Sequence, residues 1–342
     1  MAISRLCFGE CGDRTRLTDR LAFFLVVMCA GACAGPCRGH GRSGMNDGMG
    51  DNFVCHTVRV VSYPGVMVAG FVLFVFLEQA GVPLTLSSYL PVAAAAGLIT
   101  LHEIVLPHRD DWKPARAEIA NDATFLVAVQ ILLPYILSLA AVLWLADAAR
   151  ATGWAVTTLW PNDLPMLAQA LLMLVGADFL RYWMHRAFHR FAPLWRLHAV
   201  HHSPHRLYWL NVGRFHPIEK AIQYLADALP FIVLGVSEPV LAVYFVFFAI
   251  NGFFQHSNCS VRLGPLNYIV SGPELHRWHH SELAEEADTN FGNNLIVWDV
   301  LFGTRFLPAG REVGPLGLQN RAYPLSFLAQ MKSPFVNSPK AD

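Results

Sequence analysis

The chain has 342 residues, a formal net charge of zero, 54% hydrophobic residues and only 15% charged residues. A soluble domain carries roughly 25% charged residues, so this composition predicts an integral membrane protein. Zero net charge without a basic run argues against nucleic acid as a partner.

Residues 1–50 differ in pattern from the rest of the chain. Five of the seven cysteines lie in the first 37 residues, and an apolar stretch at 21–30 follows three arginines, as in a signal peptide. Alternatively, residues 1–44 precede a natural start at Met45 or Met49. We expect a signal-like or non-native, poorly ordered segment at 1–50, one membrane domain at 51–335 and a tail at 336–342.

Four apolar runs follow, each close to the length of about 20 residues that spans a bilayer as a helix. They are Val58–Leu77, Leu84–Leu106, Ala123–Ala146 and Leu164–Met184. The short turn Gly81-Val-Pro83 joins the first two runs, which predicts a helical hairpin.

The distribution of basic residues predicts the orientation in the membrane. Basic residues are frequent in Pro107–Asn121 and around the first histidines, whereas Asp147–Asp163 contains only Arg150. Loops rich in lysine and arginine face the cytoplasm. We therefore expect a multi-pass protein of the bacterial inner membrane or the endoplasmic reticulum, with its histidines on the cytoplasmic side.

A fifth apolar stretch, Ala221–Phe254, is broken at Gly235-Val-Ser-Glu-Pro239. Each half looks too short for a comfortable crossing, so the stretch predicts a re-entrant or shallow helical hairpin. The chain from Cys259 onward is more polar and is expected to form a helical cap at the membrane surface. The predicted fold class is thus all-α, with about four transmembrane helices, the hairpin and the cap.

Histidines dominate residues 185–280, which hold eleven of the fifteen in the chain. Residues three and four apart share one face of a helix, so each cluster can direct several imidazoles at one point. Neutral imidazole is the commonest metal ligand in proteins and suits iron, copper, nickel and zinc. Nine ligands exceed the four that one tetrahedral zinc uses, which predicts a two-metal centre. The expected ligands are His185, His189, His198, His201, His202, His256, His276, His279 and His280.

Two further residues are assigned supporting roles. Asp178 lies two helical turns before His185, and a carboxylate deep in an apolar helix needs a partner. We expect it to accept a hydrogen bond from a ligand histidine and so fix its tautomer; pairing with Arg181 or a neighbouring helix is the alternative. His216 is expected to act either as a tenth ligand or as a hydrogen-bonding partner.

The order of these motifs resembles the fatty acid hydroxylase and sterol desaturase superfamily. The motifs are HRxxH, LHxVHHS, QHSN and PELHRWHH, followed by NFG at Asn290 and WDVLFGT at Trp298, and the resemblance covers Ala120 to Pro334. It implies a helical membrane di-iron oxygenase that uses O2, with the nine histidines above as ligands. The motifs are more similar to the alkylglycerol monooxygenase and bacterial sterol-desaturase-like branch than to fatty acid 2-hydroxylases. Glu274 and the segment 214–219 depart from that branch and leave the substrate open.

The implied function is hydroxylation or desaturation of a C–H bond in a lipid taken from the bilayer. Sterol or carotenoid oxidation, rather than attack on an ether lipid or fatty acyl chain, is an alternative within this class. A membrane zinc hydrolase would leave six histidines unexplained, and a metal transporter would place ionisable residues along a path.

The electrons must come from elsewhere, because the chain contains no dinucleotide-binding or haem-binding motif. The resemblance therefore requires a separate electron-donor protein or a soluble reductant. Arg186, Arg190 and Arg206 could form a docking surface for an acidic donor, or simply a solvated face.

Overall fold

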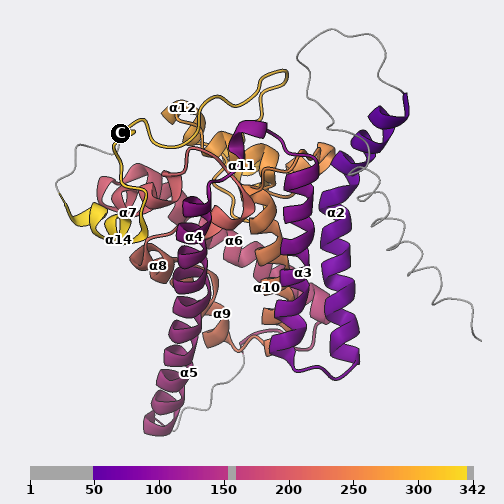
Figure 1. Cartoon of the computed structure of the whole chain (residues 1–342). Helices are drawn as coiled ribbons and strands as arrows, with labels where there is room; N and C mark the ends of the chain where they lie inside the picture. The colour runs from indigo at the N-terminus through magenta and orange to yellow at the C-terminus, as the bar shows by residue number, and fades with distance from the viewer. Residues whose placement is uncertain (1–48, 153–158, 337–342) are drawn as a thin grey trace, which may run out of the picture.

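The computed structural model describes residues 49–152 and 159–336, and in these ranges the chain is helical, with no β-strand. Long helices run side by side, and several of the shorter helices gather at one end of them (Figure 1). The long helices are α2 (Met49–Gln79), α3 (Leu84–Val105), α5 (Leu133–Thr152), α6 (Met166–Arg190) and α10 (Glu238–His256). The shorter ones are α4 (Arg116–Phe125), α7 (Ala192–His202), α8 (Pro217–Asp227), α9 (Leu229–Leu234), α11 (Pro273–His279), α12 (Ala284–Ala287), α13 (Val297–Phe302) and α14 (Phe327–Lys332).

The predicted hairpin of the first two apolar runs is confirmed. Helices α2 and α3 are joined by a tight turn in which Gly81 has φ 75° and donates its N–H to the carbonyl of Glu78 at 3.0 Å. Only glycine takes this left-handed conformation without steric cost, and Pro83 then starts α3 with its fixed backbone angle.

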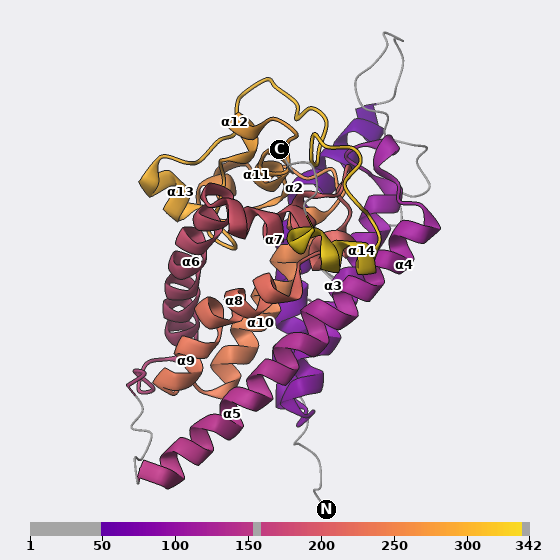
Figure 2. The same cartoon turned by 90° about the vertical axis from the view of Figure 1, so that its left-hand side faces the viewer.

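The third apolar run forms a long helical rod. Helix α4 continues through one wide π-helical segment, Leu126–Leu132, into α5. Only 6% of the most apolar stretch of this rod is buried inside the protein, so its side chains are available to contact lipid. In Figure 2 the rod crosses in front of the other long helices.

Within residues 49–152 and 159–336, four helices are long and apolar enough to span a membrane, as expected, but the fourth is not the one predicted. They are Phe53–Gln79, Leu84–Val105, Arg116–Leu145 and Glu238–His256. The predicted run Leu164–Met184 lies in α6, which is not among them; Asp178 and Arg181 lower its hydropathy.

The predicted break at 235–239 is present, because Gly235 (φ 85°) ends α9 before α10 begins. The half that follows, α10, runs unbroken for 19 residues, which is long enough to cross a membrane.

Helix α10 is central because it packs against both α2 and α3. Tyr63 and Val66 from α2, Ile99 from α3, and Val246 and Ile250 from α10 share one buried cluster. A Cβ atom at Gly70 would lie 2.5 Å from Ile250 Cδ1, so α2 approaches α10 where it has no side chain. Lipid chains are as apolar as leucine, and close packing of this kind therefore holds helices together in a membrane.

The cap lies at the end of the bundle where α6 and α10 terminate (Figures 1 and 2). It contains α7 and the chain from α11 to α14, so it begins earlier in the sequence than predicted. A buried ion pair between Arg214 and Asp122 ties α4 to the segment after α7, and Tyr208 donates its hydroxyl to the same carboxylate. The expectations for residues 1–48 and 337–342 lie outside the described residues.

Candidate metal centre

All nine histidines singled out in the sequence lie together in two adjacent groups. His202 of the first group stacks on His280 of the second, with ring centroids 4.5 Å apart. Within each group, one nitrogen from every ring lies within 4.8 Å of the corresponding nitrogen of every other ring. The first group is His185, His189, His198, His202 and His279, and the second is His201, His256, His276 and His280.

The helical spacing explains how the groups are divided. In α7, His198 and His202 are one turn apart and serve the first group, whereas His201 serves the second. In the last cluster the division is reversed, because His276 and His280 serve the second group and His279 the first. Each His-x-x-His-His motif thus contributes to both groups, which holds the two side by side.

Most of the rings are oriented by an acceptor at the outer nitrogen, Nδ1. A carbonyl oxygen can only accept, so a ring whose Nδ1 faces one carries its proton there. The lone pair of Nε2 is then free to point into the group. The acceptors are Phe291 O for His185 (2.8 Å), Asp288 Oδ1 for His189 (2.9 Å), Glu219 Oε1 for His198 (2.7 Å), Arg214 O for His201 (3.2 Å), Asn211 Oδ1 for His256 (2.9 Å) and Thr289 O for His279 (2.8 Å).

This arrangement fits a bound cation. His185 and His198 both donate from Nδ1, yet their Nε2 atoms lie only 3.0 Å apart. Two lone pairs facing each other cannot form a hydrogen bond, and a positive ion between them removes the repulsion. The Nε2 atoms of His189, His202 and His279 are also buried without a hydrogen-bond partner. The centre therefore has the donors that a metal ion needs.

The imidazoles are neutral, which metal binding requires. Burial lowers the pKa of His198, His201, His202, His279 and His280 well below the usual value for histidine, and the neighbouring histidines lower it further. The rings can therefore offer lone pairs without first losing a proton.

The role expected for Asp178 is wrong. Its carboxylate contacts no histidine and instead accepts from the side-chain amide of Asn294 at 2.9 Å and from the backbone N–H groups of Asn294 and Leu295. A carboxylate with several donors is well satisfied in an apolar helix, so it needs no histidine. Asp178 acts on the centre only indirectly, because it anchors the segment that carries Phe291.

His216 makes hydrogen bonds away from the two histidine groups. Its Nδ1 accepts the N–H of Ile218 at 3.2 Å and so caps the start of α8, while Nε2 lies 3.3 Å from the carbonyl of Met331. It belongs to neither group of converging histidines. The second of the two roles predicted for it, hydrogen bonding, is the one observed.

Glu219 was missed, although it lies three residues after His216. It is fully buried, and it accepts from His198 Nδ1 at 2.7 Å and from Gln223 at 2.9 Å. The segment 214–219 was noted in the sequence as a departure from the related branch, and Glu219 is its last residue. Asp288 and Asn211 were also missed, and no local pattern marks them.

The motif WDVLFGT has a structural explanation at the centre. Asp299 accepts the N–H groups of Phe291 and Gly292, each at 2.7 Å, and the hydroxyl of Thr304 at 2.7 Å. A Cβ at residue 292 would lie 2.1 Å from the carbonyl oxygen of Leu295, so only glycine fits. The turn held in this way sets the Phe291 carbonyl against His185.

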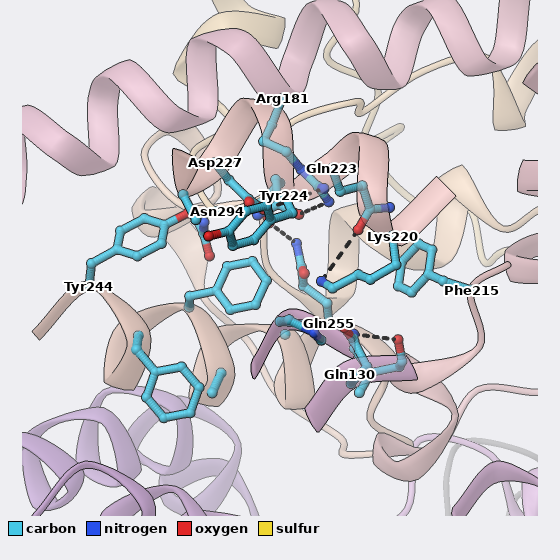
Figure 3. A pocket seen from close by; sticks show the side chains of 18 of the residues that line it. Gln130, Arg181, Phe215, Lys220, Gln223, Tyr224, Asp227, Tyr244, Gln255 and Asn294 are labelled. Atoms are coloured by element: carbon cyan, nitrogen blue, oxygen red, sulfur yellow. Dashed lines mark hydrogen bonds and ion pairs between the residues drawn. The ribbon is translucent and has the colours of Figure 1, made fainter. Parts of the chain in front are cut away.

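A cavity of about 440 Å³ opens beside the histidines. Its walls come mainly from α5, α6, α8 and α10, and they include His185 and His198 of the first group and His201 and His256 of the second. Most of the lining is apolar, but Figure 3 shows Arg181, Asp227 and Lys220 turned toward the same space. A ligand in the cavity can therefore reach both groups.

The comparisons with known proteins agree with this site. The fatty acid hydroxylase family model matches residues 170–304. Ornithine lipid hydroxylase OlsE of Rhizobium tropici is 33% identical over 280 residues, which cover 81% of this chain and 84% of that protein. Alkylglycerol monooxygenase of Xenopus tropicalis is 32% identical over 147 residues, 42% of this chain and 31% of the relative. A very-long-chain aldehyde decarbonylase of Oryza sativa is 29% identical over 146 residues, 42% of this chain and 54% of the relative.

The chain belongs to the fatty acid hydroxylase family. No solved structure gives a significant match. The family and the names of these relatives place the chain among oxidative enzymes that act on lipids, and its four apolar helices make it a membrane protein. The resemblance seen in the sequence is thereby confirmed.

Proposed function

We propose that this protein is a membrane di-iron enzyme that uses O2 to hydroxylate a C–H bond of a lipid. The observation that carries the proposal is the pair of buried histidine groups, five and four in number, that open onto one largely apolar cavity. The names hydroxylase and monooxygenase among the relatives favour hydroxylation over desaturation.

The donor set supports two metal ions rather than one. Imidazole suits iron, and nine rings are too many for a single ion of any common coordination number. When bound, a pair of iron ions would supply the redox chemistry with O2 that breaks an unactivated C–H bond. Among the described residues, neither group contains a carboxylate; Glu219 and Asp288 lie behind the rings, where they accept from Nδ1 of His198 and His189.

The protein's own side chains orient the rings and exclude water. The acceptors at Nδ1 fix each tautomer, and the apolar walls of the cavity hold a lipid carbon beside the histidines. Which hydrogen is removed depends on where the substrate carbon rests against this wall.

Electrons are proposed to enter through a second pocket, which reaches His189 and is separate from the cavity described above. A second pocket lined by Arg186, Arg190 and Asp288 reaches His189, whose Nδ1 is bonded to Asp288. An acidic donor protein would be attracted to the two arginines. Arg206 is not part of this pocket, because it pairs with Glu118 elsewhere. We place this face in the cytoplasm, on the basis of the basic loops.

An oxygen-isotope experiment tests the function. Purified protein reconstituted with ferrous iron and a chemical reductant is given ornithine lipid, alkylglycerol or sterol under ¹⁸O2. We expect one lipid to gain a hydroxyl that carries the label. A product labelled from H2¹⁸O instead, formed without O2, would show the remote alternative of a zinc hydrolase and would refute the proposal.

A further inference from the structure

The cavity beside the histidines contains buried charges that the metal centre does not use. Arg181, Lys220 and Asp227 line it, and only 6%, 6% and 8% of these residues are exposed. None belongs to either histidine group. Ionisable residues in such places are costly, and in membrane proteins they mark the path or site of a polar ligand.

Arg181 has hydrogen-bonding capacity to spare. Its Nη2 donates to Asn293 Oδ1 at 3.0 Å, and its Nη1 lies 3.5 Å from Asp227 Oδ2, which is an ion pair without a hydrogen bond. Neither Nε nor Nη1 has a hydrogen-bond partner among the described residues.

Lys220 is still less well partnered. Its ammonium makes one long hydrogen bond, to Gln223 Oε1 at 3.4 Å, and lies 5.8 Å and 5.5 Å from the ring centroids of Phe215 and Phe248. Within the described part of the chain, it makes no ion pair with a carboxylate. Figure 3 shows its side chain extending toward the cavity from the side opposite Tyr244.

We propose that the cavity binds its lipid through an anionic group, a carboxylate or a phosphate, held by Arg181 and Lys220. An anion accepts hydrogen bonds at several oxygens, so it would give Lys220 an ionic partner and accept from Nε or Nη1 of Arg181, which make no hydrogen bond within the described residues. A neutral sterol, carotenoid or alkylglycerol would leave Lys220 without an ionic partner and Arg181 with only its long ion pair to Asp227, so the desolvation of these charges would be poorly compensated.

The position of this anion site determines which part of the lipid is oxidised. Arg181 lies one turn before His185 on the same face of α6, about 6 Å along the helix axis. Gln223, the partner of Lys220, donates to Glu219, which in turn orients His198. The carbon facing the histidines is therefore only a few bonds from the anionic group, at the head-group end of the lipid. This last step rests on the proposed function, whereas anion binding does not.

Equilibrium binding of two matched lipids tests the proposal without relying on turnover. Full-length, iron-loaded protein in a neutral detergent is titrated with 1-oleoylglycerol 3-phosphate and with 1-oleoylglycerol, which share the chain and differ in the charge. Because charge-assisted hydrogen bonds are at stake, we expect the phosphate lipid to bind at least about tenfold more tightly. Equal binding, or tighter binding of the uncharged lipid, would overturn the proposal.

A pair of identical substitutions locates the effect in the cavity. Lys220→Met should weaken binding of the phosphate lipid about tenfold and leave 1-oleoylglycerol unchanged, whereas Lys113→Met, at a side chain that is 65% exposed, should change neither. A loss of affinity for both lipids in Lys220→Met would mean a structural role and would contradict the proposal.

Two further results separate the possible explanations. Inorganic phosphate should displace the phosphate lipid only at concentrations far above that of the lipid; displacement at equal concentration would refute a lipid-borne anion. If the protein prefers the anionic lipid but never oxidises any lipid, the proposed function fails and the anion site stands. If it oxidises a lipid and binds both probes equally, the function stands and the anion site fails.

Discussion

Each imidazole of the centre has two nitrogens, and the group held at the outer one decides what the inner one can do. A ring that donates to a carbonyl or carboxylate must present a lone pair on its other side. Glu219 shows this most clearly, because it is a fully buried carboxylate that accepts a hydrogen bond from His198.

Glu219→Ala should weaken metal binding, because His198 loses the acceptor that fixes its tautomer and orientation. Loss of such a partner lowers metal affinity by roughly 10-fold to 100-fold. Metal retained per chain during titration with a chelator measures the effect. His216→Ala is the matched control from the same segment, because it removes the cap of α8 but no hydrogen-bond acceptor of the nine histidines. This variant should retain metal as the wild type does. Equal retention in Glu219→Ala would contradict the role of Glu219.

Asp178→Asn should destabilise the protein even without metal. An amide keeps one acceptor oxygen but turns an NH2 group toward the N–H donors of Asn294 and Leu295. We expect a loss of about 2–4 kcal/mol in unfolding free energy, measured by thermal or denaturant unfolding of the metal-free protein. Asp163→Asn, at an exposed position, should have no such effect. Unchanged stability in Asp178→Asn would show that its hydrogen bonds are not needed.

At the scale of residues, the sequence revealed the histidines but not their partners. Residues three and four positions apart share one face of a helix, so the sequence spacing alone predicts that the imidazoles of each cluster lie close together. The acceptors could not, because Phe291 lies 106 residues from His185 and Asp288 lies 99 residues from His189. Asp178 was misassigned for the same reason, since nearness in sequence to a ligand was taken for contact.

Among the elements, α10 joins the membrane part of the fold to the centre. It packs on α2 and α3 along its length and ends at His256, whose ring belongs to the second group. The position of that ring therefore depends on how closely α2 and α10 pack at Gly70.

Gly70→Leu should push α2 away from α10, because the new side chain meets Ile250 where the Cβ alone would lie at 2.5 Å. Overpacking of this kind costs about 1–3 kcal/mol. The thermal midpoint should fall, and metal content should fall with it as His256 shifts. Gly97→Leu places the same side chain where nothing lies within 4 Å, so it should behave as the wild type. Identical behaviour of the two variants would refute the close approach.

Hydropathy correctly predicted the α2–α3 hairpin and a long apolar helix in the third run, because those segments are largely apolar. It misjudged α6 and α10, which carry the site. The apolar stretch of α6 contains Asp178 and Arg181, whose hydrogen-bonding partners lie more than 100 residues away in the sequence. The break before α10 was interpreted as the turn of a hairpin. Functional side chains disturb the apolar pattern on which such predictions depend.

Over the whole molecule, four apolar helices carry a cap in which distant segments complete one centre. Two clusters of the same spacing each supply both groups of histidines, and the cavity reaches both. The resemblance to the fatty acid hydroxylase family could be recognised from the motifs, but the arrangement of the histidines in two groups could only come from the folded chain.

The metal content of the purified protein tests this account most directly. Protein purified in detergent, reconstituted anaerobically with ferrous iron and freed of loosely bound metal should contain about two irons per chain, because the nine histidines form two groups. Alanine at His198 and at His276, one from each group, should each lower that content by about one iron. A single zinc ion per chain, retained when most of these histidines are replaced, would contradict the account.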